Sequence, residues 1–281
     1  MALVLRSSLF LSSLLLNSEA WVNLSEKNIR GLEQTDEILL SKILDADSNS
    51  SNVFKYLELG IHPVRFEIMK RKLLFLQYIL HQEENSMMSK VFKATSENPI
   101  KGDFVKTCRK YLETLGIELS FEEIKNMSKY QFTKLVKRKI TESAFKYLID
   151  KKNQPGKQTK IEQVEYENLE IQEYLLEGNK NTELSQLIFK TRGKNLEIKA
   201  HKKWKYKDNI CVGCGIKDET EEEFLSCPGL SEQNENIENI NISFNLVYGK
   251  SVKDMLRVAT FVRKRLKTRW KILEEKDNEI K

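Results

Sequence analysis

The sequence predicts an all-α fold. Its 281 residues include only 11 Gly and 4 Pro, too few for the many tight turns of a β-sandwich. Hydrophobic residues make up 40% and charged residues 31%, which is typical of amphipathic helices rather than of a disordered chain. Apolar residues recur every three or four positions along much of the chain, the period of a helix with one buried face. We therefore expect a multi-helix bundle, then a small Cys-rich hairpin resembling a zinc knuckle, and a long C-terminal helix.

The first twenty residues have two interpretations. Arg6, the apolar run Leu9–Leu16 and the segment Ser18–Ala20 follow the order of a secretory signal peptide. Asn-x-Ser acceptor sites for glycans, which a secreted protein would carry, occur at Asn23, Asn49, Asn126 and Asn241. However, two serines interrupt the apolar run, and four Cys in the whole chain provide no disulfide framework. We favour an amphipathic helix that docks on the rest of the fold, with secretion as the alternative.

Further helices are predicted up to residue 150. They cover Ser25–Leu44, Asn52–Leu59, the segment that Pro63 opens, Asp103–Leu115 and Lys129–Ile149. Gly60 closes the second of them, because Gly tolerates the left-handed conformation just beyond a helix end. Capping boxes are expected at Ser120 with Glu123 and at Ser128 with Gln131. The helix that follows Pro63 is the most apolar, and we expect it at the centre of the core.

A polar segment that contains Pro-Gly, residues 151–160, is the predicted linker between two regions. Residues 1–150 would form a helical region and residues 161–281 a second one, with a basic segment and a Cys knuckle at residues 199–230. Helices are expected over Asn168–Glu177, Thr182–Thr191 and Val252–Leu273. The last helix has a predicted core-facing stripe formed by Val252, Met255, Ala259, Val262, Leu266, Trp270 and Leu273.

The formal net charge of +6 is unevenly distributed. Basic residues gather in residues 190–207 and 250–271, and acidic residues in residues 218–238 between them. The first block interleaves cations with aromatic rings, a pattern that suits a polyphosphate backbone and base stacking. The candidate nucleic-acid-binding residues are Lys199, Lys202, Lys203, Trp204, Lys205, Tyr206 and Lys207. Solvated helix faces that pair with the acidic stretch are the alternative. No apolar run approaches the roughly 20 residues that span a bilayer, so no membrane partner is expected.

The segment CVGCGIKDETEEEFLSC provides three ligands of a tetrahedral zinc site. Cys211 and Cys214 form a C-x2-C knuckle, and Cys227 follows on the next element. The fourth ligand is open: Glu223 lies four residues before Cys227, and His201 lies ten residues before Cys211. Both zinc binding and a metal-free hairpin are compatible with this pattern.

Motifs for catalysis are lacking in the sequence. It contains no Gly-rich phosphate loop, no HExxH, no G-x-S-x-G and only three His. No two Asp are adjacent, although two-metal polymerase chemistry depends on clustered carboxylates. We expect no catalysis by this chain alone.

Three segments carry more specific patterns. IFKTRGKNLEIKAHKKWKYKDNICVGCGIKDETEEEFLSC, residues 188–227, joins an aliphatic-Phe-Lys-x-Arg helix end to a basic stretch and the Cys knuckle. LELGIHPVRFEIMKRKLLFLQYIL, residues 57–80, contains a Leu-Glu-Leu-Gly-Ile and Pro-x-Arg junction. SLFLSSLLLNSEAWVNLSEKNIRGLEQTDEILLSKIL covers residues 8–44. In these segments the chain resembles the C-terminal region of non-LTR (LINE-type) retrotransposon reverse transcriptases.

This resemblance implies that the chain is a fragment of an RNA-directed DNA polymerase. Family members hold a Tyr/Phe-x-Asp-Asp motif in an upstream palm domain, and many add an endonuclease domain. The family's zinc ligands match Cys211, Cys214 and Cys227, whereas Glu223 stands where the family usually has His. The implied role is to bind element RNA and target DNA during target-primed reverse transcription. The implied partners are RNA or DNA and the polymerase region of the parent protein. The implied location is the cytoplasm or nucleus. The alternative is a helical protein-interaction protein, or a secreted protein with the signal-like N-terminal segment, that has no nucleic-acid role.

Overall fold

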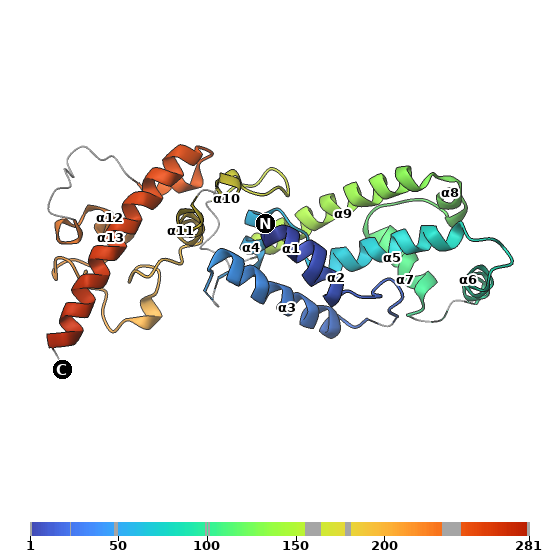
Figure 1. Cartoon of the computed structure of the whole chain (residues 1–281), viewed down its shortest axis with the longest axis horizontal. Helices are drawn as coiled ribbons and strands as arrows, with labels where there is room; N and C mark the ends of the chain where they lie inside the picture. The colour runs from blue at the N-terminus through green and yellow to red at the C-terminus, as the bar shows by residue number, and fades with distance from the viewer. Residues whose placement is uncertain are drawn as a thin grey trace. The chain divides into compact units, whose positions relative to one another are not determined.

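The computed structural model is mostly helical, at 67%. It describes residues 2–22, 24–47, 50–98, 100, 102–154, 164–177, 181–231 and 243–279. Within these ranges there is no β-strand, only an isolated antiparallel bridge between Ile210 and Asp218. The predicted all-α class is confirmed. The chain forms two compact units: Met1–Ile43 with Ile61–Lys151, and Leu44–Gly60 with Lys152–Lys281 (Figure 1).

The first unit is built from helices of one to seven turns. They are α1 (Ala2–Leu5), a π-helical turn (Arg6–Phe10), α2 (Leu11–Leu14), α3 (Glu26–Leu44), α5 (Val64–Leu80), α6 (Met87–Glu97), α7 (Phe104–Thr114), α8 (Phe121–Asn126) and α9 (Lys129–Lys152). Both predicted capping boxes are present: Ser120 and Ser128 each exchange hydrogen bonds with the residue three positions on. Helix α6 is not among the predicted helices, although Met87, Met88, Val91 and Phe92 recur at helical spacing; none of its described residues is buried.

The core of the first unit lies between α5 and the helices around it. Val64, Ile68, Leu73 and Leu76 of α5 are fully buried. On α9 the buried positions recur every four residues, at Phe132, Val136, Ile140, Ala144 and Leu148. This spacing leaves the opposite face of the helix to solvent, with cations along most of its length.

The N-terminal segment packs on the first unit, as the docked-helix interpretation predicts. Leu11 and Leu15 join the apolar cluster around Val64. The buried Arg6 guanidinium donates two hydrogen bonds to the Asp36 carboxylate on α3, at 2.8 and 2.6 Å. Burying either charge alone would be costly, so this pair fixes the segment against α3. Of the predicted glycan sites, Asn23, Asn49 and Asn241 lie outside the described residues, and Asn126 is exposed at the end of α8.

The second unit combines an early helix with the C-terminal half of the chain. It contains α4 (Asn52–Leu59), α10 (Glu173–Glu177), α11 (Thr182–Arg192), α12 (Glu221–Ser226), α13 (Val252–Glu279) and short 3-10 turns at Lys203–Lys205, Pro228–Leu230 and Phe244–Tyr248. The sequence assigned residues 44–60 to the first region, but their contacts group them with the second unit. Within the predicted linker, residues 155–160 lie outside the described part of the chain.

The helix predicted over residues 168–177 is shorter, because residues 168–172 form a non-helical segment that crosses the end of α4. There the Gln172 backbone N–H donates to the Glu58 carbonyl at 3.0 Å. Gly60 ends α4 in the left-handed conformation, with φ 61°. A Cβ at this position would lie 2.1 Å from the backbone nitrogen of Ile171. The crossing therefore requires Gly60 both for its backbone angle and for its lack of a side chain.

A buried ionic cluster joins four segments of the second unit. The Glu58 carboxylate, which is inaccessible to solvent, accepts hydrogen bonds from the Arg192 guanidinium at 3.0 and 3.1 Å. The hydroxyls of Tyr166 and Tyr174 donate to the same carboxylate, and Arg192 also donates to the Val247 carbonyl. Burial disfavours the charge of Arg192, but the Glu58 carboxylate outweighs burial and raises the Arg192 pKa. Burial and the same negative charge raise the pKa of both tyrosines, which stay neutral donors.

No helix within the described ranges is both long enough and apolar enough to cross a bilayer.

Loss of the buried guanidinium should destabilise the second unit strongly. Arg192→Met leaves Glu58 charged and buried, so we expect a loss of about 3–5 kcal/mol in the free energy of unfolding. Lys190→Met, on the same helix, removes an equal charge from a pair whose Asp45 is exposed, and should cost less than about 1 kcal/mol. Urea unfolding of the full chain measures both. Equal effects of the two substitutions would contradict the role given to Arg192.

Glu67 should contribute to the loss of stability of the first unit at acid pH. Its carboxylate lies 3.1 Å from His62 Nδ1 and also pairs with Lys70. Burial raises the Glu67 pKa, but the His62 hydrogen bond and the Lys70 charge outweigh it and lower the pKa from 4.5 to about 2. Because the folded pKa is depressed, the stabilisation is complete above pH 4.5 and is lost as the pH falls from 4.5 towards 2.

Unfolding midpoints measured in urea between pH 2 and 7 test this linkage. Glu67→Gln should flatten the decline in stability below pH 4.5, whereas Glu84→Gln, at an exposed position, should keep the decline of the wild type. An unchanged acid limb in Glu67→Gln would show that other carboxylates carry the effect.

Candidate metal centre and basic surface

A tight turn presents Cys211 and Cys214 on one side of the chain. The Cys211 N–H donates to the Lys217 carbonyl at 2.7 Å, and the Gly215 N–H donates to the Cys211 carbonyl at 2.9 Å. The bridge between Ile210 and Asp218 closes the base of this turn. Two residues after Cys227, Gly229 lies against the turn, and a Cβ there would lie 2.3 Å from the Gly213 carbonyl oxygen. The two segments that carry the cysteines therefore touch backbone to backbone.

Helix α12 supplies the other two side chains. Thr220 caps it by accepting a hydrogen bond from the Glu223 N–H at 3.0 Å, which places Glu223 in the first turn. Cys227 follows the end of the helix and is buried. One ligand atom from each of Cys211, Cys214, Glu223 and Cys227 lies within 4.8 Å of all the others. Residues from the turn and from α12 thus converge on one point.

Two distances in this cluster are close to those of a four-coordinate zinc site. The Sγ atoms of Cys211 and Cys227 are 3.6 Å apart, and Cys214 Sγ lies 3.5 Å from Glu223 Oε1. With Zn–S bonds of 2.3 Å and a Zn–O bond near 2.0 Å, a tetrahedral site has edges of about 3.8 Å between sulfurs and about 3.5 Å between sulfur and oxygen. Three thiolates with one carboxylate are also a donor set that zinc accepts.

His201, the alternative fourth ligand, is directed elsewhere. Its Nδ1 accepts a hydrogen bond from the Leu196 N–H at 3.1 Å, and its Nε2 lies 2.9 Å from a carboxylate oxygen of Glu221. His201 therefore contacts α12 through Glu221 and is not part of the cysteine cluster. Cys108 is buried on α7 of the first unit. The structure therefore brings Glu223, and neither of these residues, to the cysteines.

The environments of the thiols differ in a way that matters for metal binding. Hydrogen bonds from the backbone N–H groups of Lys217 and Ile216 lower the Cys214 pKa. Burial and the neighbouring Cys211 thiol raise the Cys227 pKa to about 12. Because zinc binds thiolates, its binding must displace protons from the less acidic thiols, and metal and protons compete for the site.

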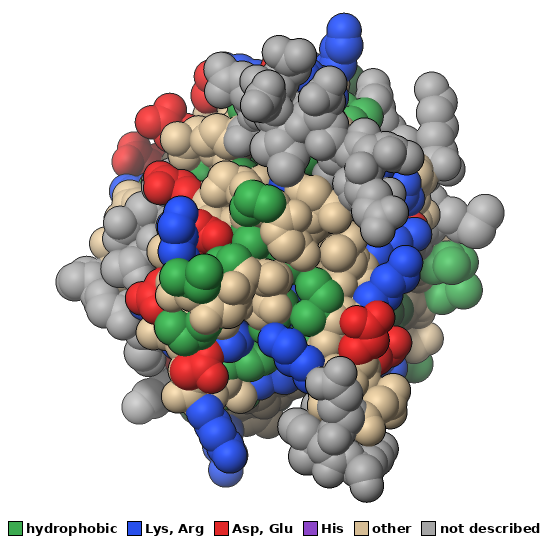
Figure 2. Space-filling model, turned by 90° about the vertical axis from the view of Figure 1, so that its left-hand side faces the viewer, with side chains coloured by type: hydrophobic (Ala, Val, Ile, Leu, Met, Phe, Trp, Pro, Cys, Tyr) green, Lys and Arg blue, Asp and Glu red, His purple; other side chains and the backbone are tan. Residues whose placement is uncertain are grey.

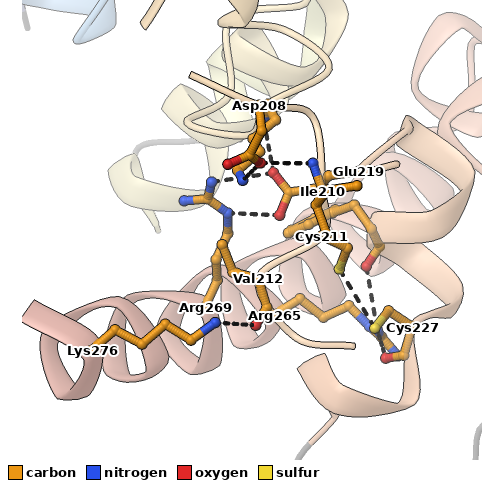
Figure 3. Close-up of polar contacts among 11 residues, drawn as sticks. Asp208, Ile210, Cys211, Val212, Glu219, Cys227, Arg265, Arg269 and Lys276 are labelled. Atoms are coloured by element: carbon orange, nitrogen blue, oxygen red, sulfur yellow. Dashed lines mark hydrogen bonds and ion pairs between the residues drawn. The ribbon is translucent and has the colours of Figure 1, made fainter. Parts of the chain in front are cut away.

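Two arginine side chains of α13 bind groups next to the cysteine cluster (Figure 3). Arg265 donates to the carbonyls of Cys227 and Phe224, at 2.7 and 3.2 Å. Arg269 forms a bidentate ion pair with Glu219, at 3.0 and 3.1 Å. Both guanidinium groups are fully buried. The helix thereby fixes α12 and the segment that follows the Cys turn, each through a buried charge.

These contacts correct the predicted core stripe of α13. Trp270, expected in the core, is 47% exposed, whereas Arg269 beside it is fully buried. Leu266 and Leu273 are only half-buried. The buried face is rotated because it must meet the carboxylate of Glu219 as well as apolar side chains.

The predicted nucleic-acid-binding segment divides into paired and exposed residues. Lys199 and Lys202 are buried and form ion pairs with Asp208 and Asp47. Lys205 pairs with Glu197 at 2.7 Å, and the half-buried Tyr206 lies beneath the cations of Lys199 and Arg269. The exposed residues that remain are Lys203, Lys207 and Trp204, with Trp204 69% exposed. Lys199 and Lys202 therefore stabilise the unit internally instead of facing a ligand.

Pairing between the basic and acidic stretches, the alternative interpretation, also occurs. Glu219 binds Arg269, and Glu221 lies 3.7 Å from the Lys194 ammonium. On the face shown in Figure 2, Lys and Arg side chains stand among Asp and Glu side chains. Regional net charge is thus a poor guide to a binding surface, and the pairing of each cation has to be considered.

Comparison of the chain with known protein families, with curated proteins and with solved structures finds no match.

The cluster should bind one zinc ion per chain. We expect Cys211→Ser and Cys227→Ser to abolish stoichiometric binding, because each removes a thiolate from a four-ligand set. Glu223→Gln should weaken binding at least tenfold, and Glu223→His should restore it. Metal content after dialysis and competition with a chromogenic chelator measure these effects.

Glu222→Gln is the matched control, because Glu222 is the exposed neighbour of Glu223 on the same helix turn, and it should leave zinc affinity unchanged. If wild-type protein takes up no zinc at micromolar concentration, the cluster is not a metal centre.

Proposed function

We propose that the second unit is a zinc-stabilised nucleic-acid-binding module. The observation that carries this proposal is the convergence of Cys211, Cys214, Glu223 and Cys227, whose ligand atoms lie within 4.8 Å of one another. Four protein ligands would fill the coordination sphere of zinc, which is the arrangement of structural rather than catalytic sites. The ion would act as a cross-link between the Cys turn and α12.

This cross-link would support a basic surface close to it in the chain. The 3-10 turn Lys203–Lys205 is flanked by two anchors, the contact of His201 with Glu221 and the ion pair of Lys199 with Asp208. Glu221 belongs to α12, the helix that also carries Glu223. Between these anchors, the exposed Lys203 and Trp204 offer a cation for phosphates and a ring for base stacking. A rigid support matters, because each ordered contact then costs less conformational entropy on binding.

The parent protein that we propose is a reverse transcriptase of the non-LTR retrotransposon type. The sequence resemblance in residues 8–44, 57–80 and 188–227 supports this origin, and the proposal assigns no catalytic role to the chain itself. RNA or DNA would be the ligand of the second unit. The polymerase region of the parent would be the further partner.

Salt-dependent binding of nucleic acid tests this function. Wild-type protein should bind a labelled 20-nucleotide RNA or DNA with a logarithmic slope against salt of about −0.7 to −0.9 per phosphate contacted. The triple substitution Lys203→Ala, Trp204→Ala and Lys207→Ala should weaken binding several-fold, because it removes two cations and a stacking ring. Fluorescence anisotropy at 50–300 mM salt gives both quantities.

A matched control replaces three exposed residues of the first unit, Lys90→Ala, Lys93→Ala and Tyr130→Ala, and should bind like the wild type. Affinity that does not change with salt, or that is equal in the two triple variants, would contradict the proposed role of residues 203–207.

A further inference from the structure

The outward face of α13 carries a row of cations. Exposed basic side chains recur at steps of four, seven, three and four residues, which keep them on one face of the helix. They are Lys253, Arg257, Lys264, Lys267 and Lys271. Between residues 252 and 271 the only acidic residue is Asp254. At 1.5 Å per residue, the row extends over about 27 Å.

Most of this charge is not neutralised inside the unit. Lys253, Lys267 and Lys271 form no ion pair with any described residue, and Arg257 is 3.7 Å from Asp254. The contrast with residues 199–207 is marked, since Lys199, Lys202 and Lys205 all have carboxylate partners there. The exposed charges of Lys253, Lys267 and Lys271 raise the local positive potential and favour a polyanion.

The inner face of the same helix holds the row in place. Val258, Ala259 and Val262 are fully buried. Arg265 and Arg269 anchor the helix to the Cys227 carbonyl and to Glu219. The backbone that carries the five cations is therefore fixed along its length. Trp270, 47% exposed and adjacent to Lys271, adds an aromatic ring beside the row.

We propose that the outward face of α13 is a binding surface for the sugar-phosphate backbone of a nucleic acid, with Trp270 available for base stacking. This inference rests on the proposed function of the second unit and names a second, larger contact surface for it. A membrane surface is disfavoured, because an interfacial helix inserts an apolar face and the apolar face of α13 is buried in the unit. Regularly repeated phosphates match a row of like charges better than an acidic protein surface does.

The test compares two triple variants of the full chain that lose the same charge. The row variant carries Lys253→Ala, Lys267→Ala and Lys271→Ala. The control variant carries Lys90→Ala, Lys93→Ala and Lys134→Ala, which replace exposed lysines of the first unit that also form no ion pair with described residues. We expect the row variant to bind a labelled 20-nucleotide RNA or DNA at least tenfold more weakly at 100 mM salt. Its salt slope should fall by about 2 to 3, the counterions released by three phosphate contacts. The control should bind within twofold of the wild type.

A charge-preserving variant, Lys253→Arg, Lys267→Arg and Lys271→Arg, should keep wild-type affinity, which separates lost charge from lost folding. Equal binding by the row variant and the control would overturn the inference. The proposed function would stand in that case if the triple variant at Lys203, Trp204 and Lys207 still bound nucleic acid more weakly than the wild type. Absence of salt-dependent binding by the wild type would overturn both. Binding of the row to vesicles containing phosphatidylserine, without binding to RNA or DNA, would overturn the inference in favour of a lipid surface.

Discussion

The ion pair between Glu58 and Arg192 is the constraint on which the second unit depends. Neither charge is accessible to solvent, and each would be strongly unfavourable there without the other. The pair, with Tyr166, Tyr174 and the Val247 carbonyl, joins segments separated by up to 189 positions (247 − 58) along the chain. Glu58 lies in LELGI and Arg192 in IFKTRG, two of the segments on which the proposed reverse-transcriptase origin rests. These segments therefore have a structural reason to occur together, independent of any enzymatic role.

The same principle of buried guanidinium groups extends to the candidate metal centre. Arg265 and Arg269 fix the two ends of α12 from one helix, at the Cys227 carbonyl and at Glu219. A small lobe with few apolar residues cannot be held by burial of hydrophobic area alone. The buried guanidinium groups therefore orient it, one through an ion pair and one through backbone carbonyls. A bound zinc ion would add a cross-link between the thiol groups. Fold and candidate site thus rely on the same kind of interaction.

Sequence reasoning succeeds where the determinants are local. Gly60, the capping boxes at Ser120 and Ser128, and the spacing of Cys211, Cys214 and Cys227 each act within a few residues, and the structure has the helix ends and the cluster that they predict. It fails where a distant partner decides. Nothing near Lys202 indicates that Asp47 binds it, and no local pattern shows that Glu219 draws Arg269 rather than Trp270 inward. Arg265 and Arg269 adjoin the predicted core positions Leu266 and Trp270, and a periodicity of apolar residues alone does not identify a buried arginine.

Whether a cation has a carboxylate partner elsewhere in the chain determines whether it is available to a ligand. A cation paired with a buried or half-buried carboxylate has already exchanged its hydration for that contact, and a phosphate would have to displace the carboxylate to gain it. Lys202, paired with Asp47, is in this position, whereas Lys267 and Lys271 are exposed and form no ion pair with a described residue. The basic block that looked stronger in the sequence, because aromatic residues interrupt it, therefore offers fewer usable charges than the outward face of α13. Affinity for nucleic acid should follow the unpaired cations and not the total basic residues of a segment.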